Sequence, residues 1–144
     1  MLVHQILKAK GNHAVITVTP ETKIEEVADL LAQRRIGGVV VSSDGKHVDG
    51  ILSERDIVRA LALRGGNCLG MKTEDLMTRN PSCCSPSDEM DTVLQRMTDG
   101  RFRHMPVTQS GELVGIVTIG DVVKARLDEL SMEKTALEEM IMGR

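Results

Sequence analysis

The chain has 144 residues and a mass of 15.7 kDa, which suits one compact domain or two small units packed closely together. Hydrophobic residues make up 41% of it, with one Phe and no Trp or Tyr. The core is therefore expected to be aliphatic, and the aromatic platforms that bind single-stranded nucleic acid are disfavoured. A formal net charge of −3 gives no general attraction to nucleic acid or to an anionic membrane.

The cysteines and the first residues indicate a reducing compartment. Cys68, Cys83 and Cys84 are odd in number and form no C-x-x-C pair, so neither a disulfide framework nor a zinc site is predicted. The N-terminal residues resemble no secretion signal, and no apolar run has the length of a membrane span. We expect a cytoplasmic protein. Burial is the expected role of Cys83 and Cys84, with redox sensing as the alternative.

The first half of the chain alternates short strands with amphipathic helices. A capping box from Thr22 to Glu25 predicts the start of one helix, whose apolar face has the spacing of Ile24, Val27, Ala28 and Leu31. The predicted elements are a helix over 2–10, a strand over 15–18, a helix from 24, strands over 37–41 and 48–52, and a helix over 54–63.

The same order of elements then repeats. Met90 lies 66 residues after Ile24 at the start of an equivalent apolar face, and Asp121 lies 65 residues after Asp56. A period of this length indicates a duplicated β-α-β-β-α unit in an α/β protein, and two such small units stabilise each other by packing together. The predicted organisation is a first repeat with an N-terminal helix over 1–64, a linker with a short helical turn over 65–77, a second repeat over 78–130 and a helical extension over 131–144.

The chemically useful pattern is a hydroxyl at the end of a strand with a carboxylate three residues later. It occurs as Ser53 with Asp56 and as Thr118 with Asp121. At the N-terminus of a helix, this pair suits a ligand that carries a diol and a phosphate. The alternative is that each Asp merely offsets the helix dipole and each hydroxyl merely ends a strand.

These stretches carry a family resemblance. Gly50–Asp56 and Gly115–Asp121 both read G-h-h-[ST]-x-x-D, where h is hydrophobic, and Arg103–Val107 reads RHMPV. With their spacing, they resemble a tandem pair of CBS domains, the module named from cystathionine β-synthase, over roughly residues 1–130. The resemblance implies two repeats packed about a pseudo-twofold axis. It also implies two equivalent clefts between the repeats, which in this family commonly bind adenosine nucleotides.

The resemblance also implies which residues would hold a ligand. In one cleft, the Asp121 cleft, Asp121 and Thr118 would serve ribose and phosphate; in the other, the Asp56 cleft, Asp56 and Ser53 would do so. The residues implied around adenine are Thr22, Ile36, Gly37 and Gly38 in the Asp121 cleft, and Phe102 beside Met105 in the Asp56 cleft. The phosphate candidates are Arg55, Arg101, Arg103 and His104, with Arg35 and Lys23 as weaker ones. No metal ligands and no catalytic residues are predicted.

The two repeats differ in charge at these junctions. The first has Glu54 and Arg55 where the second has Ile119 and Gly120. Because Glu54 would bring a second carboxylate near a phosphate, the Asp121 cleft is expected to bind better. His4, His13 and His47 are expected at the surface, whereas His104 is a candidate for phosphate binding or a response to pH.

The last predicted helix, from Ile119 to near Met142, is longer than one repeat needs. Val123, Leu127, Leu130, Leu137 and Ile141 follow a 4-3 spacing that Lys134 interrupts. We expect this stripe to support a homodimer or bind a client protein, the alternative being a solvated overhang.

The function favoured by the sequence is a regulatory module that senses AMP, ATP or NAD. The alternative is a docking module with empty clefts. An enzyme is disfavoured because no nucleophile elbow, Walker A loop or H-E-x-x-H is present.

Overall fold

A computed structural model of the chain describes residues 1–11 and 15–143, and the prediction for His13 lies outside these residues. The helices are α1 (Val3–Lys10), α2 (Ile24–Arg34), α3 (Glu54–Arg64), α4 (Thr73–Leu76), α5 (Met90–Gly100) and α6 (Ile119–Ile141), with a 3-10 helix η1 (Gly65–Gly70). The strands are β1 (Thr17–Val18), β2 (Gly38–Val41), β3 (Gly50–Ser53), β4 (Thr78–Arg79), β5 (His104–Gln109) and β6 (Glu112–Thr118). Within the described residues, no helix is long and apolar enough to cross a membrane.

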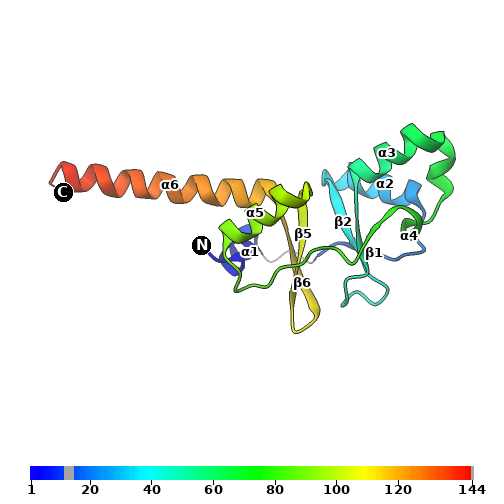
Figure 1. Cartoon of the computed structure of the whole chain (residues 1–144), viewed down its shortest axis with the longest axis horizontal. Helices are drawn as coiled ribbons and strands as arrows, with labels where there is room; N and C mark the ends of the chain where they lie inside the picture. Colours follow the sequence, from blue (N-terminus) through cyan, green and yellow to red (C-terminus); the bar gives the residue numbers. More distant parts are fainter. Residues whose placement is uncertain (12–14, 144) are drawn as a thin grey trace.

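Two halves lie side by side along the long axis of the molecule, and α6 projects from one of them (Figure 1). The first half holds a four-stranded sheet of order β1-β2-β3-β4, and the second holds the antiparallel pair β5-β6. A parallel bridge between Cys84 and Val107 extends the second sheet; the same pairing in the first repeat joins Val18 to Val41. The predicted duplicated α/β unit is confirmed.

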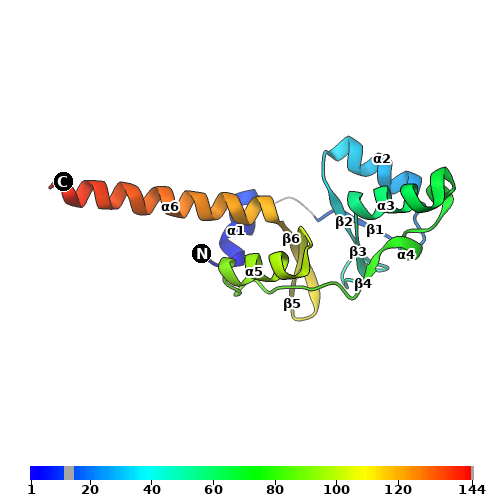
Figure 2. The ribbon, with the colours of Figure 1, turned by 45° about the horizontal axis from the view of Figure 1, so that its top comes forward.

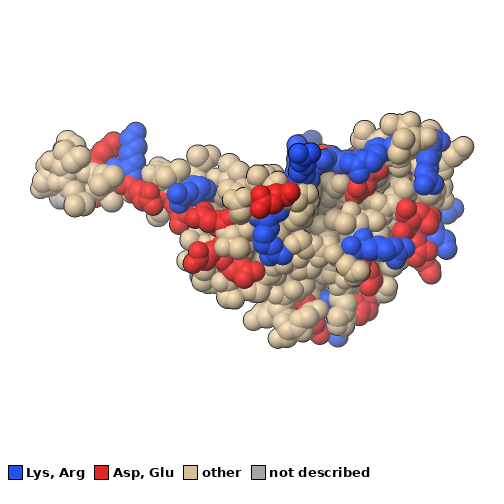
Figure 3. Space-filling model, viewed as in Figure 1, with Lys and Arg blue, Asp and Glu red and all other residues tan. Residues whose placement is uncertain are grey.

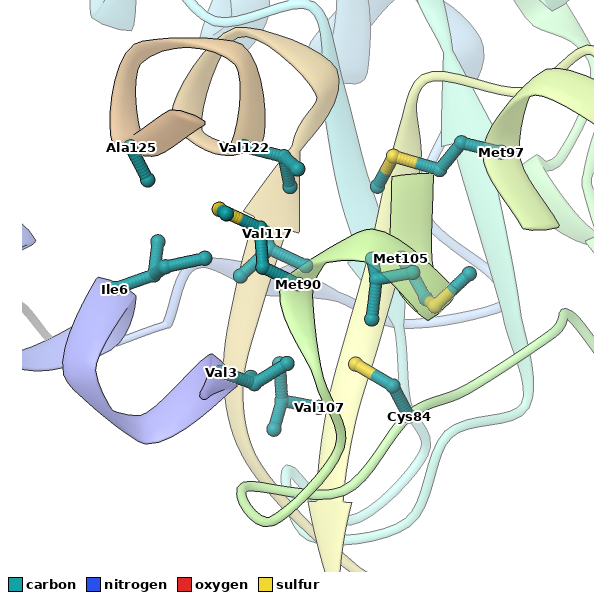
Figure 4. Packing of buried hydrophobic residues seen from close by; sticks show 11 residues of the cluster. Val3, Ile6, Cys84, Met90, Met97, Met105, Val107, Val117, Val122 and Ala125 are labelled. Atoms are coloured by element: carbon teal, nitrogen blue, oxygen red, sulfur yellow. The ribbon is translucent and has the colours of Figure 1, made fainter. Parts of the chain in front are cut away.

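Each half has its own aliphatic core. In the second, Met90 and Met97 of α5, Met105 of β5 and Val122 of α6 close around the sheet (Figure 4). Cys84 belongs to this core, as expected, and burial raises the pKa of its thiol to about 11. Cys83 is only half-buried, and burial raises the pKa of its thiol as well.

The segment that precedes each repeat packs against the other repeat. In sequence α1 lies next to the first repeat, yet Val3 and Ile6 are buried in the second core (Figure 4). The backbone repeats this exchange: the Val3 N–H donates to the Asp88 carbonyl at 2.9 Å, and the Thr73 N–H donates to the Thr22 carbonyl at 2.8 Å. The chain therefore ties its halves together by crossing between them, a connection that short-range sequence patterns do not report.

Two local predictions differ from the structure. The strand expected over 15–18 is reduced to Thr17–Val18. The capping box predicted at Thr22 is wrong, because Lys23 is the N-cap of α2 and its side chain accepts no capping hydrogen bond. The Thr22 hydroxyl oxygen instead accepts from the Thr19 N–H at 3.2 Å. Thr22 thus stabilises the turn before the helix. His4 and His47 are exposed, as expected.

The glycine that opens each G-h-h-[ST]-x-x-D stretch allows a close approach. A Cβ on Gly50 would come within 2.7 Å of the Thr78 carbonyl oxygen, and one on Gly115 within 2.8 Å of a Leu7 methyl carbon. Both distances are shorter than real contacts of this kind. These glycines let the neighbouring segment, β4 in one repeat and α1 in the other, pack directly on the strand that leads to the candidate site.

Candidate ligand-binding clefts

The hydroxyl–carboxylate pairs have the same geometry in both repeats. Oδ2 of Asp121 accepts from the Thr118 N–H at 2.9 Å, and the Asp121 N–H donates to Thr118 Oγ1 at 3.1 Å. Oδ2 of Asp56 accepts from the Ser53 N–H at 2.9 Å, and the Asp56 N–H donates to Ser53 Oγ at 3.4 Å. These are reciprocal capping boxes for α6 and α3. Helix capping alone therefore accounts for the spacing of these residues.

Capping engages only one oxygen of each carboxylate. Within the described part of the chain, no hydrogen bond uses Oδ1 of Asp121 or Asp56. The helix starts are also held against the sheets: the Glu54 N–H donates to the Gly37 carbonyl at 2.8 Å, and the Ile119 N–H donates to the Arg103 carbonyl at 2.9 Å. Each junction thus presents a fixed carboxylate oxygen that can accept further hydrogen bonds.

The Asp121 cleft lies between the two repeats and has a volume of about 640 Å³. This volume is in the range of small-molecule sites. Four of the residues predicted for this cleft lie together on its wall: Thr118, Ile36, Gly37 and Gly38. The α1 helix closes another side with Leu7, Lys8 and Lys10, which the sequence analysis did not assign to the site.

Lys10 forms the most specific contact at this cleft. Its Nζ lies 2.7 Å from Oδ2 of Asp121 and 2.9 Å from the Ile116 carbonyl oxygen. Both side chains of the ion pair are partly exposed, at 33% for Lys10 and 22% for Asp121, so water screens the attraction. The carboxylate of Asp121 is therefore paired, through a contact that water screens, with a lysine that also lines the cleft.

The Asp56 cleft has a volume of about 480 Å³. Its wall brings together the predicted residues Ser53, Asp56, Phe102, Arg55, Arg101, Arg103 and His104. Arg59 adds a further guanidinium that the sequence analysis missed. Arg55 donates from Nη1 to the Arg101 carbonyl at 3.2 Å, which joins α3 to the loop after α5. Lys and Arg side chains gather around the hollow between the two halves (Figure 3).

His104 separates the two clefts and lines both. Its ring lies over the Gly37–Gly38 backbone, since a Cβ on Gly38 would come within 3.2 Å of three ring carbons. Burial lowers the pKa of His104, and Arg103 and Lys10 lower it further, while Glu54 and Asp121 act in the opposite direction. The imidazole is therefore predominantly neutral near pH 7.

Several predicted residues lie elsewhere or in more than one place. Met105 is fully buried in the second core and lines neither cleft. Thr22 lines neither cleft and contacts Thr19 and Thr73 instead. Lys23, a weaker phosphate candidate, is likewise absent from both walls. Glu54, expected to affect the Asp56 cleft, lines both. Met105 follows His104 along β5 and so faces the opposite side of the strand, whereas Thr22 and Lys23 lie in the turn that leads into α2.

Two arginines mark equivalent positions at the cleft rims. Arg35 and Arg101 end α2 and α5 in the left-handed conformation, with φ of 54° and 56°. Glycine is the usual residue at such a helix end because a side chain makes it costly. Arg35 lines the Asp121 cleft and Arg101 the Asp56 cleft. The repeated use of arginine at a position that favours glycine places a cation at each cleft.

The fold and site define a duplicated α/β protein with paired clefts between its repeats. The CBS domain model matches residues 11–63 and 74–128, which together cover well over half of the chain. The chain therefore belongs to the CBS domain family.

Similar proteins span almost all of the chain. CBS domain-containing protein CBSX3, mitochondrial, of Arabidopsis thaliana is 30% identical over 148 residues, covering 98% of this chain and 72% of that protein. The crystal structure of a CBS-domain containing protein from Agrobacterium tumefaciens has a TM-score of 0.83 at 43% identity, covering 88% of this chain and 99% of that one.

Two further similar structures hold ligands. A CBS domain protein from Pyrobaculum aerophilum was solved in complex with AMP; it has a TM-score of 0.77 at 28% identity, covering 92% of this chain and 99% of that one. The CBS domain pair of protein MJ0100 was solved with 5′-methylthioadenosine and S-adenosyl-L-methionine. It has a TM-score of 0.78 at 26% identity, and the match covers 90% of this chain and 98% of that one.

Proposed function

We propose that this protein is a regulatory module that senses an adenosine nucleotide in the clefts between its repeats. The observation that carries the proposal is the repeated junction: a fixed carboxylate oxygen stands at the start of α3 and of α6. Asp56 lines its cleft directly, and Asp121 is joined to its cleft by Thr118 and Lys10, which line the wall. The adenosine ligands of two similar structures support the same class of ligand. The candidates remain AMP, ATP and NAD, and no catalytic step forms part of the function.

In the Asp121 cleft, Oδ1 of Asp121 would accept from the ribose hydroxyls. The His104 ring already lies over Gly37 and Gly38, so adenine would lie beside this ring, between the aliphatic side chains of Ile36 and Ile116. Lys10 would turn from Asp121 to the phosphate, which favours a nucleotide over an uncharged nucleoside. The ligand thus replaces an internal ion pair with two interactions of its own.

Such a ligand would couple the repeats. The walls of the Asp121 cleft come from α1 and β6 on one side and from residues 35–38 on the other, so a ligand that contacts both favours the relative orientation in which both contacts form. A partner that prefers one orientation would then respond to the nucleotide concentration. This is how a module without catalysis regulates a client protein.

The test is a thermal-shift series with AMP, ATP, NAD and S-adenosyl-L-methionine, with GMP as the non-adenine control. A nucleotide at about 100 times its Kd stabilises a folded protein by about 2.7 kcal/mol, which corresponds to a rise of several degrees. Asp121→Asn keeps an oxygen for capping but loses the charge, and we expect it to lose most of the rise with AMP. Asp56→Asn, which leaves the Asp121 cleft intact, is the matched control for AMP.

The outcomes separate sensing from the alternative. If no adenine nucleotide shifts the wild type at millimolar concentration, the sensor proposal fails and the carboxylates act only as helix caps. If Asp56→Asn loses the shift and Asp121→Asn keeps it, a sensor remains but its main site is the Asp56 cleft.

A further inference from the structure

The second half of α6 extends beyond the fold. The last ion pair that joins α6 to the body within the described residues is at Glu129, whose carboxylate lies 3.2 Å from the N-terminal amine of Met1. All residues from 131 to 143 are exposed, and both ribbon views show this half of α6 standing free of the two repeats (Figures 1 and 2). Most surface residues at its tip are uncharged on the face in Figure 3.

This free half does not have the character of a solvated helix. An isolated helix of this length is marginally stable in water, and here it exposes Leu137 at 59%, Met140 at 76% and Ile141 at 84%. An exposed apolar stripe of this kind, interrupted only at Lys134, marks a surface that is covered by another protein segment. The stripe begins beside the body and reaches the end of the helix: Val123, Leu127, Leu130, Leu137 and Ile141.

The spacing of the stripe is that of a coiled coil. Alternating steps of four and three place Val123, Leu130 and Leu137 at d positions, and Leu127, Lys134 and Ile141 at a positions. Three repeats of this pattern are present, and the partner helix that would complete the seam is not supplied by the described residues of this chain. A pattern that needs a similar helix opposite is met by a second copy of α6.

We propose that α6 pairs with α6 of a second copy in antiparallel orientation. In this register Val123 faces Ile141 of the second copy, Leu127 faces Leu137, and Leu130 faces Lys134. The aliphatic stem of Lys134 lies along Leu130 while its ammonium reaches water. Every apolar residue of the stripe is then covered, and a twofold axis near residue 132 makes the interface self-complementary.

Charges decide between the two orientations. In a parallel pair, Lys134 would meet Lys134 of the second copy in the seam, and Glu133 would lie beside Glu138 across it, because g and e positions are neighbours there. In the antiparallel pair, e positions meet each other, so Lys124 lies beside Glu138 of the second copy, and the symmetry makes this contact twice. In the antiparallel pair g positions also meet, which places Glu133 beside Glu133 of the second copy once. The two attractive contacts outnumber this one repulsive contact, whereas the parallel pair has only the repulsive ones among these residues.

The body of the molecule leaves room for the second helix. Val122 and Ala125 are buried against the second core, whereas Val123, Leu127 and Leu130 on the adjacent face are 43%, 60% and 44% exposed. The stripe thus turns away from the repeat that α6 packs on. The antiparallel register also places the second body beyond the tip of the helix.

The orientation can be tested by exchanging charges in the full chain. Sedimentation equilibrium on the wild type is expected to show a dimer at micromolar concentration. Lys124→Glu and Glu138→Lys are each expected to weaken the dimer about tenfold or more, since each puts like charges together twice. The double exchange restores the attraction and is expected to return the dissociation constant to near the wild-type value. Glu139→Lys, the same charge change away from the seam, is the matched control.

Two results would overturn the proposal. A wild type that stays monomeric up to about millimolar concentration removes the second copy as occupant, leaving a client protein or solvent. A dimer that the double exchange fails to restore has another orientation or another interface. Ending the chain after residue 130 distinguishes a dimer through α6 from a dimer through another interface. It should abolish the α6 pair, while the melting temperature of the two repeats changes little. The readout does not depend on any nucleotide.

Discussion

The Asp121 cleft and the Asp56 cleft share one backbone frame but differ in how their charges are used. In the former, the carboxylate is paired with Lys10 at 2.7 Å. In the latter, Arg55, Arg59, Arg101 and Arg103 line the wall, and no ion pair within the described residues engages them. The duplication has thus kept the capping box, which fixes the carboxylate, while the cations around it have diverged.

This difference suggests that the clefts discriminate between ligands by charge. The Asp121 cleft is lined by two guanidiniums, Arg35 and Arg103, and by Lys8 and Lys10, of which Lys10 is already paired with Asp121; this set suits a ligand with fewer phosphate oxygens. Several guanidiniums favour a ligand with more phosphate oxygens, because each fork-shaped group binds two of them. The carboxylate of Glu54 weakens phosphate binding in both clefts, because it lines both of them. We expect the Asp121 cleft to prefer AMP and the Asp56 cleft to prefer ATP.

Among the variants that test this difference between the clefts, Lys10→Met is expected to change ligand affinity most. The variant keeps the aliphatic stem but removes the cation, so AMP should lose about tenfold in affinity for the Asp121 cleft, the effect of one charge-assisted hydrogen bond. Adenosine should bind about as well as to the wild type, because it carries no phosphate for Lys10 to contact. Isothermal titration of both ligands measures the ratio. Lys8→Met, on the same wall, is the control; equal losses for AMP and adenosine would contradict the assigned role.

A smaller effect is expected from Gly38→Ala. The added Cβ would lie 3.2 Å from the His104 ring, which is tighter than an ordinary contact, so the ring must shift toward the clefts. Overpacking of this kind costs about 1–3 kcal/mol and lowers the melting temperature by several degrees. AMP affinity should fall a few-fold. At Gly66, a Cβ meets no described atom within 4 Å, so Gly66→Ala should change neither quantity. An unaltered Gly38→Ala protein would show that the ring moves freely.

The sequence predicts the parts of this site that depend on the repeat. Once the spacing of 66 residues between Ile24 and Met90 is recognised, the two hairpins and the two strand-to-helix junctions follow. Similarity to known CBS pairs then groups Thr118 with Gly37 and Gly38. The order of the longer strands and helices was predictable to the same extent from local periodicity. The bounds of the two-residue strands β1 and β4 were not, because their pairing with β2 and β3 sets them.

The contacts between distant segments were not predictable in this way. Lys10 and Asp121 lie 111 residues apart, and no local pattern links a side chain at the end of α1 to the start of α6. The buried position of Met105 had a signal that was missed: neighbours along a strand face opposite sides, so His104 in the clefts places Met105 in the core. The prediction that Thr22 lines a cleft is wrong because contacts with α4 set the turn that holds Thr22.

The smallest effect on the comparison is expected from pH, through His104 between the clefts. Burial lowers the pKa of this imidazole, so between that value and the usual 6.5 the unfolded chain binds a proton that the folded chain does not. The resulting stability is full above about pH 7 and is lost as the pH falls through 6.5 toward the folded pKa. His104→Gln should flatten this part of the melting-temperature profile between pH 8 and 5.5. In His47 the Asp44 carboxylate raises the pKa of the imidazole, so its contribution to stability has the opposite sign and His47→Gln is a suitable contrast.

A bound phosphate should favour protonated His104, so AMP affinity should rise as the pH falls. A pH profile that His104→Gln leaves unchanged would show that the ring does not link the clefts to pH.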